Sequence, residues 1–481
     1  MSDNALAYMF RIFWIVFLAF ILVDTFCKSW NTENGKNERV LPNGHGTFVG
    51  YDPILFPIIA AIYLALCIGI PAAKKEDILL NAITLMDMVL FITIYFTILL
   101  IFLPVLRRYY MAKTCAAFWI VPVVLYFQPN MLETFAVPPA VVFYIPENFL
   151  TILGCIWITG FGVIFTIQVM SHLRFSKKLQ TNSRPVEDDS LLELWNKMKK
   201  EMDIPLIVDL KYCSEINTPL TLGMRMKNTT TYLPEHSFTD EEAELIFAHE
   251  LRHIQRRDTH MKFFLRFCCA FGWIHPLIWV AVRKAEDDLE LSCDEIVLKD
   301  ADKDKRRKYA ELLLSIAGDS RGYSTCLSAS ARSLRYRLKA ALPVKNKRKG
   351  VVLLFLIMIA SGLCTGRLAL STNRGTLSEL AGPDTAEISN ADVKSGRYDD
   401  FHEIKDVGEL SQYLSEMEVE RILTGYENET SEGGLRGEFA ASNRSFALSG
   451  NFLSITNIVS GETEKYYIRI SLDWEFIESL K

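Results

Sequence analysis

The sequence predicts a polytopic α-helical membrane protein that also carries two soluble segments of mixed α and β structure. Half of its 481 residues are apolar, and they gather in long uncharged runs instead of spreading evenly along the chain. A helix needs about 20 predominantly apolar residues to cross the hydrocarbon layer of a bilayer. Six runs approach or reach that length, at about 6–27, 52–71, 83–106, 114–128, 148–170 and 350–370.

The first and fourth runs differ from the others. Run 6–27 follows Ser2, Asp3 and Asn4, has almost no positive charge before it and lacks a small-residue cleavage signature, so we expect a retained span rather than a removed signal. Run 114–128 is short and contains Pro122. It either continues into the apolar stretch that follows Asn130 or only dips into the membrane.

Basic residues predict the orientation of the spans. Lys and Arg in short flanks favour the cytoplasmic side. Three basic clusters lie after the third run, after the fifth and before the sixth: Arg107, Arg108 and Lys113; Arg174, Lys177 and Lys178; Lys345, Lys347, Arg348 and Lys349. The pair Lys74 and Lys75 opposes this orientation for the first two spans. We therefore expect a transmembrane region at 1–170 with about five spans, a cytoplasmic domain at 171–349, a last transmembrane helix at 350–370, and extracytoplasmic residues at 371–481.

The segment 171–349 is long enough for one domain. Apolar residues at helical spacing predict an amphipathic helix over 187–202, and PLIVDLKYC, INTPLTLGMRM and TTTYLPE read as short extended pieces. The capping box Thr239-x-x-Glu242 starts a further helix. The apolar stretch 266–282 contains Gly272 and Pro276, so we expect a hairpin, packed on the domain or seated in the inner leaflet, followed by a separate charged helix.

The segment 371–481 is expected to form a small α+β or β-rich domain. Its start, to about residue 400, is rich in Ser, Thr, Gly and Asp, which favours a disordered linker. LSQYLSEMEVERIL fits a helix, and SFALSGNFLSITNIV and KYYIRISLDWEF alternate as strands joined near Gly461. No cysteine follows Cys364, so an outer domain needs no disulfides.

The stretch AHELRHIQRRDTH holds three of the eight histidines of the chain. His249 and His253 are four residues apart on the helix that the capping box starts, so their imidazoles share a face, and Glu250 lies beside them. Two histidines and a glutamate in this pattern bind a catalytic zinc ion and activate a water molecule for peptide hydrolysis. By composition such a pentapeptide arises by chance in roughly one chain in a hundred of this length, so a structural or vestigial site is the alternative.

A catalytic zinc ion needs a third protein ligand. The stretch LELSCDE offers Glu290 and Asp294 on one helix face, so that one carboxylate can bind the metal while the other orients a histidine. Asp258 is another candidate for the orienting role. His260 lies two turns from His253 and is expected at the surface, and Cys293 is expected to be a small buried residue.

These motifs together resemble the BlaR/MecR-type membrane zinc metallopeptidases, the antirepressor sensor-transducers. The resemblance covers roughly residues 83–371 and includes LRRYYMAK, NTPLTLG, HELRHIQRRD and WIHPLIWVAVRKAEDDLELSCDE. It implies a cytoplasmic α+β zincin-like (gluzincin) metalloprotease domain, with His249, His253 and Glu290 as zinc ligands and Glu250 as the catalytic base. It further implies an extracytoplasmic signal, and cleavage of the protein itself or of a cytoplasmic repressor to derepress genes.

The resemblance fails at both ends of the chain. The best-known members carry a penicillin-binding sensor built on a Ser-x-x-Lys motif, whereas no serine of this chain has a lysine three residues on. We therefore expect no covalent β-lactam sensor. The runs 6–27 and 52–71 are two N-terminal spans beyond the usual first span of the family, and the sequence assigns them no role.

Two other interpretations of the whole protein are compatible with parts of the pattern. A constitutive quality-control metalloprotease for membrane proteins has the same motif but little use for an outer domain. A catalytically inactive receptor is opposed by the intact His-Glu-His set. The basic stretch 329–350 is either a self-cleavage site or a membrane-surface helix. The expected partners are the lipid bilayer, a cytoplasmic protein substrate such as a transcriptional repressor, and an extracytoplasmic ligand; the net charge of −5 without a basic stripe argues against direct nucleic-acid binding.

Overall fold

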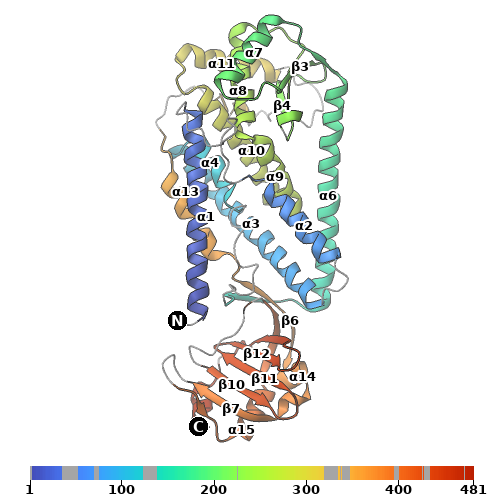
Figure 1. Ribbon diagram of the computed structural model, residues 1–481, viewed down its shortest axis with the longest axis vertical. Coiled ribbons are helices and arrows are strands. Elements are labelled where there is room, and N and C mark those ends of the chain that lie inside the picture. The colour runs from blue at the N-terminus through green and yellow to red at the C-terminus, as the bar shows by residue number, and fades with distance from the viewer. Residues whose placement is uncertain are drawn as a thin grey trace.

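The molecule is elongated, with a helical bundle in the middle and a β-sheet at each end (Figure 1). The computed structural model describes residues 3–34, 52–69, 75–122, 138–224, 226–318, 334–335, 337–338, 347–394, 400–424, 426, 434–470 and 472–481. The larger sheet belongs to the C-terminal region, and the smaller one lies beside the histidine-bearing helix.

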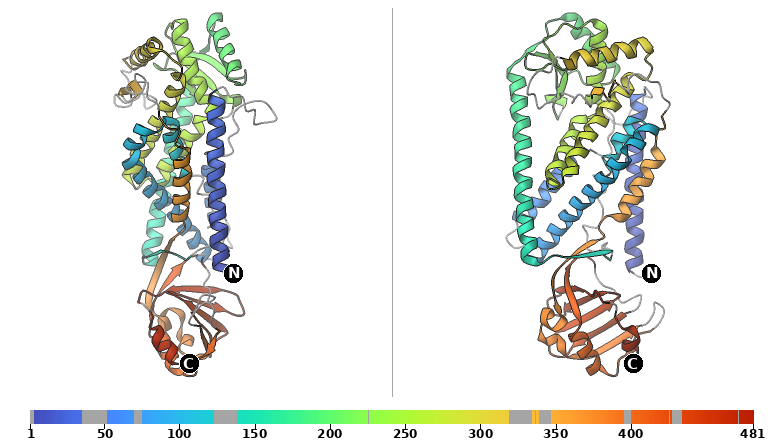
Figure 2. Two further views of the ribbon diagram at one scale, coloured as in Figure 1. Left: turned by 90° about the vertical axis from the view of Figure 1, so that its left-hand side faces the viewer. Right: turned by 180° about the vertical axis from the view of Figure 1, so that it is seen from behind.

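The bundle is built from long apolar helices and one helical hairpin. Its elements are α1 (Asp3–Glu33), α2 (Leu55–Gly69), α3 (Lys75–Tyr109), α4 (Ala112–Phe118), α6 (Glu147–Thr181), α9 (Asp258–Phe271), α10 (Pro276–Val297) and α13 (Val351–Cys364). Helices α1 and α6 lie on opposite sides of the bundle (Figure 2). The N-terminus lies at the end of the bundle that faces the C-terminal sheet.

Among the described residues, three helical stretches are long and apolar enough to cross a membrane: Tyr8–Asn31, Val89–Tyr109 and Glu147–Thr181. They coincide with the predicted runs 6–27, 83–106 and 148–170. Helix α2 covers 15 residues of run 52–71, and the predicted last span 350–370 is too long, because α13 ends at Cys364 and a strand begins at Leu368. Helix α4 has seven residues, and the part of run 114–128 beyond residue 122 lies outside the described residues.

The predicted hairpin at 266–282 is confirmed, but it packs inside the bundle. Gly272 ends α9, and Pro276 at the first turn of α10 starts the return helix. Phe267 lies edge-on to Phe56 of α2 and to Phe161 of α6. The predicted charged helix is not separate, because α10 runs without a break to Val297.

The smaller sheet has the strand order β2-β3-β5-β4, with β4 at an edge and antiparallel to β5. The predicted helix over 187–202 is confirmed as α7, and Asp188 caps it by accepting hydrogen bonds from two backbone amides. The capping box of Thr239 and Glu242 is also confirmed at the start of α8. The elements of this region are β2 (Ser183–Pro185), α7 (Asp189–Glu201), β3 (Asp209–Cys213), β4 (Leu220–Leu222), η3 (Met226–Asn228), β5 (Thr230–Pro234), α8 (Asp240–Arg256) and α11 (Lys303–Gly318).

The larger sheet has the order β1-β6-β9-β13-β12-β11-β10-β7-β8. Its first strand comes from the helical region, where β1 pairs in parallel with β6. Three short helices and one 3-10 turn accompany the sheet. The bounds are β1 (Val141–Tyr144), β6 (Leu368–Thr376), α14 (Leu377–Ala381), η4 (Pro383–Ala386), β7 (Ile388–Lys394), β8 (His402–Glu403), α15 (Val407–Ser415), β9 (Glu418–Leu423), β10 (Gly434–Phe439), β11 (Arg444–Ser449), β12 (Phe452–Asn457), β13 (Thr463–Tyr467) and α16 (Trp474–Ser479).

The disordered linker predicted up to residue 400 is wrong over its described part. Residues 368–394 form β6, α14, η4 and β7, and Ala391 and Val393 are buried in the core of the sheet. The small and polar residues of this stretch lie between buried apolar ones, so composition alone concealed the strand pattern. The predicted helix LSQYLSEMEVERIL is helix only to Ser415 and continues as β9.

His260 is buried, contrary to the surface position predicted for it. Its Nδ1 lies 2.7 Å from Asp52 Oδ2, and its Nε2 lies 2.7 Å from the carbonyl oxygen of Met224. Because both partners are acceptors, both ring nitrogens donate, which requires the charged imidazolium. The hydrogen bond to Asp52 raises the pKa of His260. The residue thus ties α9 to the start of α2 and to the loop after β4.

We expect this tie to stabilise the protein in a pH-dependent way. Since the folded pKa of His260 lies above the ordinary value of about 6.5, the contribution is complete below that pH and is lost as the pH rises through the raised pKa. In detergent, Asp52→Asn should lower the melting temperature at pH 6 and have less effect at pH 9. The exposed Glu193→Gln on α7 is the control, and an equal loss at both pH values for Asp52→Asn would contradict the prediction.

Candidate metal centre

Helix α8 carries two histidines whose rings face each other. The side chains of His249 and His253 are only 11% and 10% exposed, their ring centroids are 4.8 Å apart, and their Nε2 atoms are 3.1 Å apart. The helix has a well-defined start at its capping box and packs through Leu245, Phe247 and Leu251 into the core beside α7. The one-turn spacing read from the sequence therefore brings two nitrogen lone pairs to one point.

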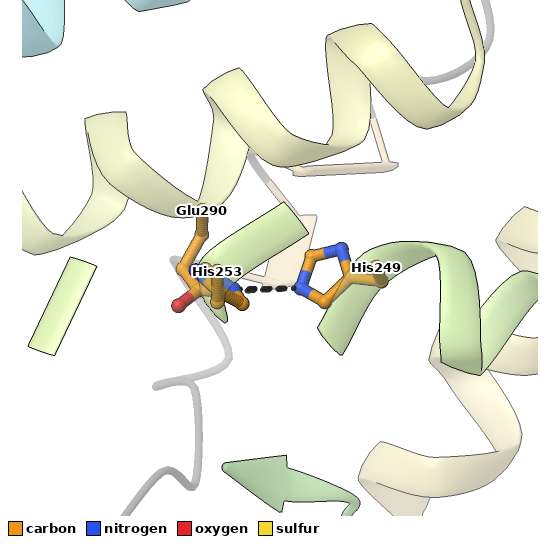
Figure 3. Close-up of side chains that lie close together, drawn as sticks. All are labelled: His249, His253 and Glu290. Atoms are coloured by element: carbon orange, nitrogen blue, oxygen red, sulfur yellow. Dashed lines mark hydrogen bonds and ion pairs between the residues drawn. The ribbon is translucent and has the colours of Figure 1, made fainter. Parts of the chain in front are cut away.

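Helix α10 brings Glu290 to the same point. Its Oε2 lies 3.3 Å from His249 Nε2 and 3.5 Å from His253 Nε2 (Figure 3). Each of the three residues offers a ligand atom within 4.8 Å of the others. Ligand atoms about 2.0–2.1 Å from a tetrahedral ion are about 3.3 Å apart from one another. The spacing of the three atoms therefore fits a zinc-sized ion.

Each histidine has a carboxylate on its other ring nitrogen. His253 Nδ1 lies 2.7 Å from Asp258 Oδ2, and His249 Nδ1 lies 3.3 Å from Asp294 Oδ1. The phenol of Tyr309 donates to Asp294 over 2.5 Å and lies 3.1 Å from His249 Nδ1. Metal-binding histidines are commonly fixed by carboxylates in this way, which sets the ring orientation and the tautomer.

The position of Asp258 depends on a strained residue. Arg257 ends α8 with the left-handed values φ 55° and ψ 43°, which cost a residue with a side chain about 1–2 kcal/mol. The chain turns there so sharply that α9 starts at once. Asp258, the first residue of α9, can then reach back to His253.

Glu250, the residue after His249, is buried and is not part of the cluster of three ligand residues. The hydroxyl of Thr221 donates to Glu250 Oε2 over 2.8 Å. Thr221 belongs to β4, the edge strand of the smaller sheet. The edge of the sheet and the glutamate of α8 therefore meet directly.

Cationic side chains balance the acidic groups. Lys262 Nζ lies 3.2 Å from Glu290 Oε1, and Arg337 forms a two-pronged hydrogen bond of 2.7 and 2.8 Å with Asp294. Burial raises the pKa of Glu290, but Lys262 and His253 outweigh it and hold that pKa well below its ordinary value. Burial lowers the pKa of His249, yet the hydrogen bonds to Asp294 and Glu290 raise it to about 9.

The structure thus brings together five of the residues that the sequence singled out for the site: His249, His253, Asp258, Glu290 and Asp294. Glu250 follows His249 on α8 and is held by the hydroxyl of Thr221. Four contributors were missed, namely Thr221, Lys262, Tyr309 and Arg337. Thr221 lies within NTPLTLG and Arg337 within the basic stretch 329–350, but neither stretch marks these residues as part of a metal site. No motif marks Lys262 or Tyr309, which reach the site from α9 and α11. Cys293 is buried as predicted, but it also lies 3.4 Å from His253 Nδ1 and accepts a hydrogen bond from Arg256.

Comparison with known proteins finds relatives of the region that carries this site. Residues 128–340 match the family described as BlaR1 peptidase M56. The chain is 28% identical to the regulatory protein BlaR1 of Bacillus licheniformis over 233 residues, 48% of this chain and 37% of that protein. It is 26% identical to the methicillin resistance mecR1 protein of Staphylococcus aureus over 109 residues, 22% of this chain and 18% of that protein. Residues 128–340 are therefore similar to M56 peptidases, and this part of the chain resembles BlaR/MecR-type proteins.

Proposed function

We propose that this chain is a zinc-dependent endopeptidase, with His249, His253 and Glu290 as metal ligands and Glu250 as the catalytic base. The observation that carries the proposal is the spacing of 3.1 to 3.5 Å among three ligand atoms from two packed helices. Two nitrogens and one carboxylate oxygen are a donor set that zinc accepts, and the fourth position is left for water. The domain built on this site would be zincin-like.

Zinc bound at these residues would lower the pKa of a water molecule and polarise the peptide carbonyl. Glu250 would take the proton of the attacking water on a carboxylate oxygen and deliver it to the nitrogen of the leaving amine. The hydroxyl of Thr221 donates a hydrogen bond to Oε2 of Glu250 and so fixes that oxygen of the carboxylate. An extended peptide laid along the edge strand β4 would bring its backbone next to Glu250.

Asp258 and Asp294 would act through the histidines. Each accepts from a ring nitrogen that faces away from the ligand point, so each keeps the Nε2 lone pair of its histidine directed to the metal. Arg337 and Tyr309 in turn hold Asp294.

We further propose that the protein is a multi-pass protein of the cell membrane, with the peptidase domain in the cytoplasm and the C-terminal domain outside. The two sheets lie at opposite ends of a bundle that contains three helices long and apolar enough to cross a membrane (Figure 1). The basic flanks favour the peptidase end as the cytoplasmic one. The boundaries 1–170, 171–349 and 371–481 follow this division, while the last helix is α13 alone and both β1 and the start of β6 belong to the C-terminal sheet.

The proposed role is signalling. A relative is named a regulatory protein, and the chain has a folded C-terminal domain that a housekeeping protease does not need. That domain would sense an extracytoplasmic ligand, and the peptidase would then cleave itself or a cytoplasmic repressor to derepress genes. The chain spans well under half the length of the relatives it matches.

Replacing Glu250 by glutamine should abolish hydrolysis while the metal stays bound. The variant keeps the shape of the side chain but cannot take a proton, so cleavage should fall by at least about 100-fold. Proteomics of cells that carry either form would identify the fragments that disappear, and elemental analysis would measure zinc. Fragments from a cytoplasmic repressor support signalling, fragments from many membrane proteins support quality control, and unchanged cleavage contradicts the mechanism.

Glu290→Gln should weaken zinc binding by more than about 100-fold, because a carboxylate ligand is lost directly. Affinity would be measured on the purified full-length protein by competition with a chelator. Glu286→Gln is the matched control, since Glu286 lies one turn earlier on α10 and pairs with Arg266. Equal affinities for the two variants would remove Glu290 from the ligand set.

Single cysteines in a background without native cysteines test the orientation. Val459 and Lys303 are exposed, the first in the loop after β12 and the second at the start of α11, and these two elements lie at opposite ends of the molecule (Figure 1). A membrane-impermeant thiol reagent added to intact cells should label Val459→Cys and leave Lys303→Cys unlabelled until the cells are opened. The reverse pattern would overturn the proposed sidedness.

A further inference from the structure

Glu33, the last residue of α1, is a buried carboxylate at the base of the metal centre. Its side chain is 1% exposed, and Oε2 lies 2.6 Å from Lys113 Nζ. Its Oε1 lies 3.7 Å from Nε of Arg256, the last residue of α8. A helix from the far N-terminus of the chain thus ends against the helix that carries both histidines.

Arg256 connects Glu33 to the carboxylate that holds a histidine. Its Nε lies 3.4 Å from Asp258 Oδ1, and its terminal nitrogens donate to Ser292 Oγ over 2.5 Å and to Cys293 Sγ over 3.2 Å. The other oxygen of Asp258 is the one that lies 2.7 Å from His253 Nδ1. The buried groups therefore alternate in charge from Lys113 through Glu33 and Arg256 to Asp258.

This alternation makes Glu33 a determinant of how Asp258 holds His253. Two carboxylates share the single charge of Arg256, and buried charges interact strongly because little water screens them. Without the negative charge of Glu33, the guanidinium would be drawn to Asp258 alone. The hydrogen bond that Asp258 accepts from His253 would then be weaker, and the orientation and basicity of the His253 ring depend on that bond.

The opposite end of α1 is bonded to the last helix before the C-terminal domain. Arg11 is buried, and its guanidinium donates to the carbonyl oxygens of Gly362 and Thr365 at the end of α13. Strand β6 of the larger sheet begins three residues after Thr365. One continuous helix of 31 residues therefore joins the base of the C-terminal domain to the support of His253.

We propose that Glu33 is a positioning residue of the metal centre, and that α1 couples the junction of α13 and β6 to the peptidase site through it. The inference rests on the proposed zinc site and assigns a role to the first of the two additional N-terminal spans. A shift of α13 would be transmitted along α1 to Glu33, and from there through Arg256 and Asp258 to His253.

The test measures metal binding rather than cleavage. Full-length protein carrying Glu250→Gln, so that it does not digest itself, would be compared with and without Glu33→Gln. Zinc affinity would be measured by competition with a chelator, and the ligand field by the visible spectrum of the Co²⁺-substituted protein. We expect about a tenfold loss of affinity, at the lower end of the range for groups that orient ligands, and a shifted Co²⁺ spectrum.

Asp24→Asn is the matched control, because Asp24 also lies on α1 but pairs with Lys28 within the helix. It should leave affinity and spectrum unchanged. In an Asp258→Asn background, Glu33→Gln should cause no further loss, since it acts through Asp258. Additive losses, or an unchanged spectrum and affinity in the Glu33→Gln protein, would overturn the inference.

Two further outcomes distinguish a failure of the proposed zinc site from a failure of the Glu33→Gln variant to fold. If the parent protein with Glu250→Gln binds no zinc, the proposed function itself is wrong, and the inference falls with it. If Glu33→Gln does not fold, Glu33→Asp carries the test, because it keeps the charge but moves it away from Arg256. An Asp variant that folds and binds zinc as tightly as the parent, with an unchanged Co²⁺ spectrum, would contradict the inference.

Discussion

The close approach of α8 and α10 is the contact on which the rest of the site depends. It brings two imidazoles and the Glu290 carboxylate into a space where the ligand atoms are 3.1 to 3.5 Å apart. So dense a group of buried polar atoms is costly unless each atom has a partner. The partners come from the outside of the site, where Asp258 and Asp294 face the histidines and Lys262 and Arg337 face the acids.

The hairpin of α9 and α10 explains how this arrangement is held. Its closed end, at Gly272 and Pro276, lies among the bundle helices, where Phe267 and Phe271 pack against Phe161 of α6. Its open end carries Asp258 and Lys262 on one helix and Glu290 on the other. The apolar packing fixes the direction of both helices, and the polar end is positioned as a consequence.

The sequence predicted what depends on local spacing and missed what depends on distant contacts. The capping box of Thr239 and the four-residue spacing of the histidines follow from helix geometry. Glu290 could be predicted as a ligand because it shares one face of a second predicted helix with Asp294. His260 was placed wrongly because its partner Asp52 lies 208 residues earlier in the chain. Strand β6 was taken as part of a linker because its pairing with β9 is not visible in its composition.

Two helices join the ends of the molecule by different means. Helix α6 is flanked by β1, which pairs with β6, and by β2, which pairs with β3, so main-chain hydrogen bonds fix it to both sheets. Helix α1 has no flanking strand among the described residues and is held by side chains, through Arg11 at one end and Glu33 at the other. Main-chain pairing tolerates little change in spacing, whereas ion pairs between side chains can lengthen by fractions of an ångström at small cost. The electrostatic connection is therefore the one that can alter the metal site without unfolding either sheet.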